Sequence, residues 1–335
     1  MDNSLTVEEN QQIQYCFPLQ NLSCMKALRT NGENIMMYIY FASLSVLTVF
    51  LNLLAIISIS HFKQLHTPTN FLILSLAVSD LIVGFFVMPL EAIRLIENCW
   101  YFGDVFCSIY PLICYIVISA SLGNMVFISI DRYIAVSDPF RYTCLITTGK
   151  TLICILICWS CSLFYSLGIL FNHLFYPETH GTCYGECVLI ISFTWVIIDL
   201  FVSLIAPCSV VCSLYMRIFC IARHQANVIK SVKVNLTFED NGVASKSERK
   251  AAKTLGIVVA IYMLSWVPYY ISIVVAGGLN STSSLTNFFA WLMSMNSCVN
   301  PIIYALFYPW FRVSVKHILT LKIFEPSSSY LTLVH

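Results

Sequence analysis

The sequence predicts an all-α protein built as a bundle of seven transmembrane helices. Of its 335 residues, 58% are hydrophobic and only 10% are charged, whereas soluble domains carry about 25% charged residues. The mean hydropathy of +0.79 supports the same class. Seven apolar stretches are each long enough for the roughly 20 residues that a spanning helix needs, namely 36–60, 70–92, 105–130, 151–171, 188–219, 255–276 and 286–308.

Proline occurs within or close to several of these stretches. In lipid, the backbone groups of a spanning segment must be satisfied inside the protein, and helices therefore tolerate interior prolines by bending. We expect such kinks at Pro89, Pro207, Pro268 and Pro301.

The basic residues predict the orientation. Lysine and arginine are concentrated after the first, third and fifth stretches and in the C-terminal segment, which places these parts in the cytoplasm and the N-terminus outside. We expect an extracellular segment (1–35), a transmembrane domain (36–308) with a third cytoplasmic loop (223–249), and a cytoplasmic segment (309–335) that begins with a short amphipathic eighth helix. No charged n-region precedes a short apolar h-region, so no cleavable signal peptide is expected.

The outer segments contain two glycosylation sequences and several cysteines. Asn21 and Asn280 each begin an Asn-x-Ser/Thr sequence and are expected to carry glycans. An oxidising compartment permits disulfides among the cysteines of these segments and of the helix ends, which are Cys16, Cys24, Cys99, Cys107, Cys183 and Cys187. "CWSC" at 158–161 lies inside a predicted helix, and we interpret it as packing. The scattered histidines predict no structural metal, and no cofactor is expected.

Short motifs then follow one another through the helices. "DRY" at 131–133 closes the third, "SWVP" at 265–268 lies in the sixth and "NPIIY" at 300–304 ends the seventh; the other helices contribute Asn52, Asp80 and Trp159. Taken in order, these motifs resemble the rhodopsin-like class of G-protein-coupled receptors.

A narrower resemblance lies near the C-terminus. "NSCVNPIIYALFYPWF" at 296–311 matches the seventh-helix signature of the trace amine-associated receptors, and "SERKAAKTLGIVV" at 247–259 is similar to that family's entry into helix six. The resemblance implies a plasma-membrane receptor for cationic amines in olfactory sensory neurons. It also implies signalling through a stimulatory G protein to cyclic AMP.

The resemblance further implies roles for several cysteines. Cys107 resembles the helix-three cysteine that is bonded to the second extracellular loop, with Cys187 as its partner. Cys183 is then left for an N-terminal cysteine, and Cys24 is favoured over Cys16.

Two polar groups inside the bundle match family features. The family's sodium pocket, which would hold an allosteric ion, corresponds to Asp80, Ser121, Asn296, Ser297 and Asn300. The alternative is a polar network without an ion, because buried polar groups bond one another in any case. The activation switch corresponds to Asp131, Arg132, Glu248, Tyr215, Asn300, Pro301 and Tyr304, with Arg132 and Glu248 as an ion pair of the resting state. The alternative is that Arg132 and Glu248 form a solvated ion pair that contributes little to stability.

The family pattern breaks on helix three. The position seven residues after Cys107, where aminergic receptors place an aspartate for the ligand ammonium, is Cys114. A thiol in an apolar wall is a poor substitute for a carboxylate. Asp199 lies in the apolar run "WVIIDLFVSLIAP", where a charge costs about 2.5–3.5 kcal/mol. We therefore predict that Asp199 on helix five pairs with the ammonium, against the alternative of a neutral buried acid.

Other residues would complete the pocket. Ser192, Trp195 and Ser203 share a helix face with Asp199. Aromatic rings can support a cation or an alkyl chain, and the remaining expected wall residues are Tyr115, Ile118, Trp266, Tyr269, Tyr270 and Trp291.

A second acid could turn the pocket toward diamines or polyamines. Glu91 either pairs with Arg94, three residues later on the helix, or points inward as a second anionic pole, and Glu186 is its rival.

Three other functions remain as alternatives. The first is a receptor for a non-amine ligand, since loss of the helix-three acid would also accompany loss of amine specificity. A transporter is disfavoured because no inverted repeat occurs, and an enzyme because no catalytic constellation does.

Overall fold

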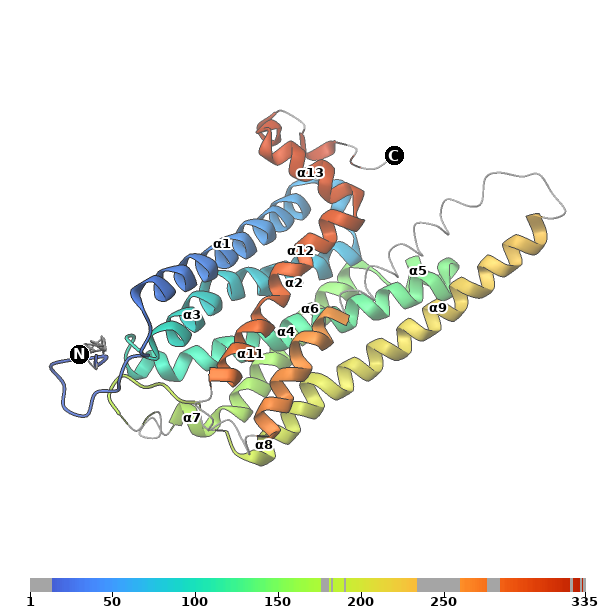
Figure 1. Cartoon of the computed structure of the whole chain (residues 1–335). Coiled ribbons are helices and arrows are strands. Elements are labelled where there is room, and N and C mark those ends of the chain that lie inside the picture. The colour runs from blue at the N-terminus through green and yellow to red at the C-terminus, as the bar shows by residue number, and fades with distance from the viewer. Residues whose placement is uncertain are drawn as a thin grey trace, which may run out of the picture.

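The computed structural model describes residues 14–175, 181, 183–189, 191–233, 260–275, 284–325, 328–331 and 333. Long helices run side by side as one bundle, with α7 and α8 at the end near the N-terminus and α13 at the other end (Figure 1). The described part of the chain is helical apart from loops and two isolated bridges.

The described residues form seven helical columns in the bundle. The first, third and fourth are α1 (Asn31–His61), α4 (Asp104–Ser137) and α6 (Thr148–Ile169). The second runs through α2 (Pro68–Ile82), η2 (Val83–Val87) and α3 (Met88–Glu97). The fifth runs through α8 (Phe193–Asp199), η4 (Leu200–Ile205) and α9 (Ala206–Lys233). The sixth is Ala260–Val275, and the seventh consists of α11 (Ser284–Ser294) and α12 (Asn296–Phe307).

Shorter helices connect or follow these columns. They are η1 (Lys63–Leu65), α5 (Pro139–Leu145), α7 (Phe171–Phe175), α13 (Pro309–Leu319), η5 (Lys322–Phe324) and η6 (Ser328–Tyr330). In the described residues, five columns are long and apolar enough to cross a membrane, and Ala260–Val275 is a shorter apolar helix.

Capping explains why the first helix begins earlier than its hydropathy predicts. The hydroxyl of Thr30 accepts from the backbone N–H of Glu33, and the carboxylate of Glu33 accepts from the backbone N–H of Thr30. This capping box stabilises a first turn at Asn31 instead of residue 36. Hydropathy does not detect this turn because its residues are polar.

Two expected proline kinks take a specific form. The π-helical turns η2 and η4 lie immediately upstream of Pro89 and Pro207. A proline lacks an N–H and its ring clashes with the carbonyl four residues before it, and a widened turn accommodates both defects. The turn η4 follows Asp199 directly and contains Ser203, which is bonded to it.

The central column, α4, packs tightly on α6. A Cβ atom at Gly123 would overlap the sulfur of Cys158, which is buried and lies 3.7 Å from the carbonyl oxygen of Ala120. The first cysteine of "CWSC" is therefore a packing residue at a close contact between two helices.

We predict that Gly123→Ala destabilises the protein by about 1–3 kcal/mol, because overpacking forces the neighbouring helices apart. Thermal unfolding of the purified protein should give a lower Tm. The double variant Gly123→Ala/Cys158→Ala should recover most of the loss.

Gly168→Ala is the matched control, because Gly168 also lies inside a helix and, in the described part of the chain, no atom beyond its adjacent residues and its own helix backbone lies within 4 Å of the position of its Cβ. An equal effect of both single variants, or no recovery in the double variant, would show that the Gly123–Cys158 contact is not limiting.

Candidate ligand-binding site

A cavity of about 180 Å³ opens between the helices at the end of the bundle that carries α7 and α8. Its walls come from α3, α4, the fifth column, the sixth helix, α11 and the loop segment 185–189. The predicted residues that line it are Asp199, Cys114, Tyr115, Ile118, Ser203, Trp266, Tyr269, Tyr270 and Glu91, together with Glu186.

Asp199 is the most heavily bonded of these residues. Its side chain is buried, with 8% of the residue exposed. The hydroxyls of Tyr165 and Ser203 donate to its Oδ1 at 2.6 and 2.8 Å, and the hydroxyl of Tyr270 donates to its Oδ2 at 2.8 Å. Donors directed at a carboxylate stabilise its charged form. An ionised carboxylate has about four acceptor positions, so these three hydroxyls leave one for a ligand.

Aromatic rings continue from Asp199 into the bundle. Trp266 stacks with Tyr270 at 6.0 Å and with Tyr262 at 5.0 Å, and Tyr269 meets Tyr270 edge to face at 5.5 Å. Their faces can support a cation near Asp199 and an alkyl chain farther away.

Cys114 lies on the α4 side of the cavity, with apolar neighbours and with Glu91 and Arg94 nearby. It packs against the clusters that contain Tyr110 on one side and Met88 and Val117 on the other. This wall carries no carboxylate at position 114, so it suits the apolar part of a ligand.

Glu91 lies on α3 with two partners. The hydroxyl of Tyr110 donates to its Oε1 at 2.7 Å, and a guanidinium nitrogen of Arg94 lies 3.7 Å from the same oxygen. Arg94 also lines the cavity. The structure therefore combines the two predicted arrangements, because Glu91 both lines the cavity and pairs with Arg94.

Three predicted pocket residues, Ser192, Trp195 and Trp291, are not among those that line the cavity. Trp195 packs against the cluster of Ile169, Leu170 and Ile273, and Ser192 is exposed. Trp291 is buried against Phe41 of α1, with ring centroids 4.5 Å apart. Sequence spacing gave the correct helices here, but it does not determine which neighbour an aromatic ring selects.

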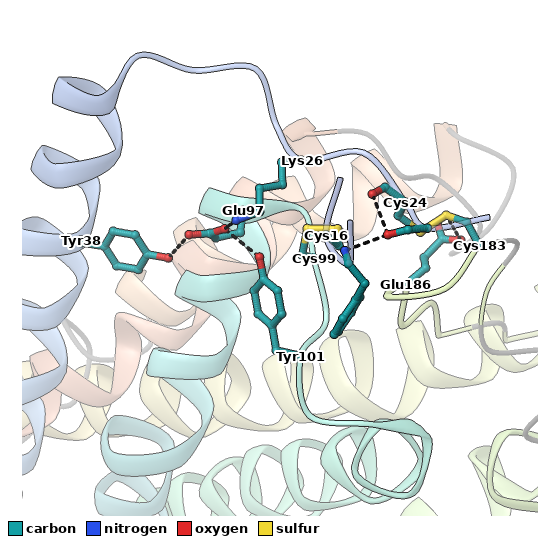
Figure 2. The surroundings of a disulfide bond; sticks show 11 residues. Cys16, Cys24, Lys26, Tyr38, Glu97, Cys99, Tyr101, Cys183 and Glu186 are labelled. Atoms are coloured by element: carbon teal, nitrogen blue, oxygen red, sulfur yellow. Dashed lines mark hydrogen bonds and ion pairs between the residues drawn. A yellow bond between two sulfur atoms is a disulfide. The ribbon is translucent and has the colours of Figure 1, made fainter. Parts of the chain in front are cut away.

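Three disulfides join the outer segments. Cys107 is bonded to Cys187, Cys24 to Cys183, and Cys16 to Cys99. The last two attach residues 14–30, which we call the N-terminal strap, to the loops that border the cavity (Figure 2). Cys99, Gly185, Glu186 and Cys187 line the cavity, so these bonds fix part of its wall.

Backbone contacts seat the strap on the second extracellular loop. The N–H of Cys24 donates to the carbonyl oxygen of Tyr184 at 3.0 Å, and the N–H of Tyr184 donates to that of Leu22 at 2.8 Å. Gly185 has a φ of +94°, and the ring of Phe17 occupies the space that a Cβ would need. Only glycine satisfies both conditions without strain.

Glu97 forms a polar clamp at the base of the strap. Lys26 contacts its carboxylate at 2.9 Å, and the hydroxyls of Tyr38 and Tyr101 donate to it at 2.9 and 2.8 Å (Figure 2). The hydrogen bond to Glu97 raises the pKa of Lys26, and burial raises the pKa of Tyr101. The clamp joins the strap, α1 and the first extracellular loop.

A separate polar group surrounds Asp80, which is fully buried below the cavity. The side-chain amide of Asn300 donates to its Oδ2 at 2.7 Å and the hydroxyl of Ser121 donates to its Oδ1 at 3.5 Å; Ser297 is a further partner. The side-chain amide oxygen Oδ1 of Asn296 has no hydrogen-bond partner among the described residues. Carboxylate, hydroxyl and amide oxygens suit a hard cation such as sodium, and these residues could hold one.

At the cytoplasmic end, Arg132 is bound by its own neighbours. Its guanidinium donates to the carboxylate of Asp131 and contacts the hydroxyl of Thr69, and the hydroxyl of Tyr142 donates to Asp131 at 2.8 Å. The predicted partner Glu248 lies outside the described residues. Tyr215 and Tyr304 have hydroxyls without a hydrogen-bond partner in the described part, and Pro301 lies inside α12.

Three features of the site were not predicted. Tyr165 carries no sequence signal, because one tyrosine in an apolar helix looks like core. The Cys16–Cys99 bond could have been suspected from two outer cysteines without assigned partners. Arg94 was expected beside Glu91 but not in the cavity wall.

Of the two predicted glycosylation residues, Asn21 is exposed in the strap, and Asn280 lies outside the described residues.

Comparison with known proteins gives a consistent result. Residues 51–304 match the model of the 7 transmembrane receptor (rhodopsin family). The chain is 40% identical over 336 residues to trace amine-associated receptor 13c of Danio rerio, with 98% of each protein covered. It is 41% identical to trace amine-associated receptor 6 of Rattus norvegicus, with 96% of each protein covered. It is 38% identical to trace amine-associated receptor 4 of Mus musculus, and the match covers 95% of this chain and 94% of that receptor.

We predict that the double variant Cys16→Ser/Cys99→Ser has a lower Tm than the wild-type receptor, because the bond closes a long loop and fixes Cys99 in the cavity wall. Thermal unfolding of the purified receptor measures this. Cys144→Ser, which removes an exposed free cysteine, is the control. An unchanged Tm in the double variant would mean that the strap is held by its other contacts alone.

Proposed function

Because the chain belongs to the trace amine-associated receptors within the rhodopsin family of seven-transmembrane receptors, we propose that it detects cationic amines through an ion pair with Asp199. Family membership itself establishes the general type of protein. It is a multi-pass receptor of the plasma membrane that acts on a heterotrimeric G protein, and it is not an enzyme.

The hydroxyl shell of Asp199 is the observation that carries this proposal. Three hydroxyl donors occupy acceptor positions of the carboxylate at a depth where a polar group without partners would be costly. They do not neutralise it, since a hydroxyl donates a hydrogen bond but no charge. An ammonium arriving at the remaining acceptor position would form a charge-assisted hydrogen bond, which is stronger than a neutral one.

The walls favour one orientation of the ligand. The ammonium lies at the fifth column, between Asp199 and the rings of Tyr269 and Tyr270. The apolar remainder extends toward Cys114 and Ile118 on α4. This is the reverse of binding to an aspartate on the third helix, the role that Cys114 cannot perform because a thiol is mainly neutral at physiological pH.

Signalling follows from the same arrangement. We propose that occupied receptor favours an open cytoplasmic end that a stimulatory G protein binds, which raises cyclic AMP in olfactory sensory neurons. A ligand shifts such an equilibrium only by its preference for one state. Arg132 would leave Asp131 and Thr69, and the hydroxyls of Tyr215 and Tyr304 would gain partners. A sodium ion at Asp80 would favour the closed state.

We predict that Asp199→Asn lowers amine potency by at least about 100-fold, because it removes one member of a buried charge pair. A cyclic AMP reporter in cells with matched surface expression measures this, with alkylamines and the alcohols of equal chain length as ligands. The wild-type receptor should respond to the amines and not to the alcohols.

Asp104→Asn is the matched control, since Asp104 is an exposed acid in the first turn of α4 and should retain the wild-type response. A normal amine response in Asp199→Asn would make Asp199 a structural acid. Activation of the wild-type receptor by the alcohols would instead support a receptor for non-amine ligands.

A further inference from the structure

The charged residues of the cavity wall are unevenly arranged. Asp199, Glu91 and Glu186 are the acids among the described lining residues, and Arg94 is the base. Asp199 is surrounded by hydroxyls, whereas Glu91 lies beside the guanidinium of Arg94, with 3.7 Å between Nη1 and Oε1. The two acids that could receive opposite ends of a long ligand therefore present different electrostatic surfaces.

The helix itself fixes the Glu91–Arg94 pair. The two residues lie three positions apart on α3, so their side chains project from the same face. The hydroxyl of Tyr110 donates to the Glu91 oxygen that faces Arg94, which restrains the carboxylate. Glu91 and Arg94 keep 15% and 29% of their side-chain surface exposed. A ligand in the cavity can therefore meet both charges.

We propose that Arg94 masks Glu91 and thereby makes the receptor selective for amines with a single positive charge. This inference rests on the proposed pairing of an ammonium with Asp199. A second ammonium that approached Glu91 would meet the positive charge of Arg94 at the same place, and like charges repel more strongly where water is partly excluded. A neutral alkyl or hydrogen-bonding end meets no such repulsion.

Specificity in this arrangement comes from a repulsive element as much as from an attractive one. The Glu91–Arg94 pair has no net charge, so the α3 side of the cavity contributes little attraction for a dication. If Arg94 were neutral, Glu91 would keep its hydrogen bond from Tyr110 and would become a second anionic pole. Arg94 is therefore a specificity-determining residue, and its removal should produce a gain of response.

The experiment compares n-alkylamines with α,ω-diamines of the same chain lengths on the full-length receptor. Potency is read from the G-protein response, and binding is read separately from the ligand-induced rise in Tm of the purified receptor. Arg94→Gln should increase diamine potency relative to the matched monoamine by at least tenfold. Arg94→Lys should keep the wild-type preference because it keeps the positive charge.

Two further variants identify the acid. The double variant Glu91→Gln/Arg94→Gln should return the ratio of diamine to monoamine potency to its wild-type value. Glu186→Gln in the Arg94→Gln background should retain the gain. The unliganded Tm and surface expression of each variant show whether it is folded.

The outcomes separate this inference from the proposed function. The masking role alone is overturned if the wild-type receptor responds to monoamines and Arg94→Gln leaves the ratio of diamine to monoamine potency unchanged. A wild-type preference for diamines that disappears in Glu186→Gln also overturns it, and places the second pole at the loop. No amine response in any folded receptor overturns the proposed function and the masking role together.

Discussion

The energetic cost of a buried carboxylate governs the binding end of this receptor. Asp199 lies in an apolar helix and is almost inaccessible to solvent, yet three hydroxyls from α6, η4 and the sixth helix bond to it. The bonds from Tyr165 and Tyr270 join the fifth column to α6 and to the sixth helix, whereas the bond from Ser203 stays within the fifth column. One side chain therefore links three helical columns.

The rest of the cavity is organised around that charge. The aromatic rings of Trp266, Tyr269 and Tyr270 provide a surface on which both a cation and an alkyl chain are tolerated. Cys114 makes the α4 wall apolar, and Glu91 with Arg94 makes the α3 wall charged but without net charge. Outside, the two strap disulfides and the Glu97 clamp hold the loops that complete the cavity. Under the proposed function, charge would recognise one end of a ligand and shape the other.

The fold and the location of Asp199 in the cavity wall could be predicted because their signals are strong and local. Apolar stretches of spanning length determine the helices, and an acid in such a stretch is conspicuous because of its cost. The sequence did not predict which neighbours some side chains contact in the folded bundle. Spacing placed Trp195 and Trp291 on the correct helices, but packing turned them toward Ile273 and Phe41 and away from the cavity. Tyr165 was missed because a bonding role for one tyrosine appears only when α6 meets α8.

The most direct test of the account is the structure of the receptor with a bound alkylamine, determined by electron cryo-microscopy. The account predicts that the ammonium nitrogen lies about 3 Å from a carboxylate oxygen of Asp199, with the alkyl chain directed toward Cys114. An ammonium paired with Glu91 or Glu186, and Asp199 still bonded only to Tyr165, Ser203 and Tyr270, would contradict it.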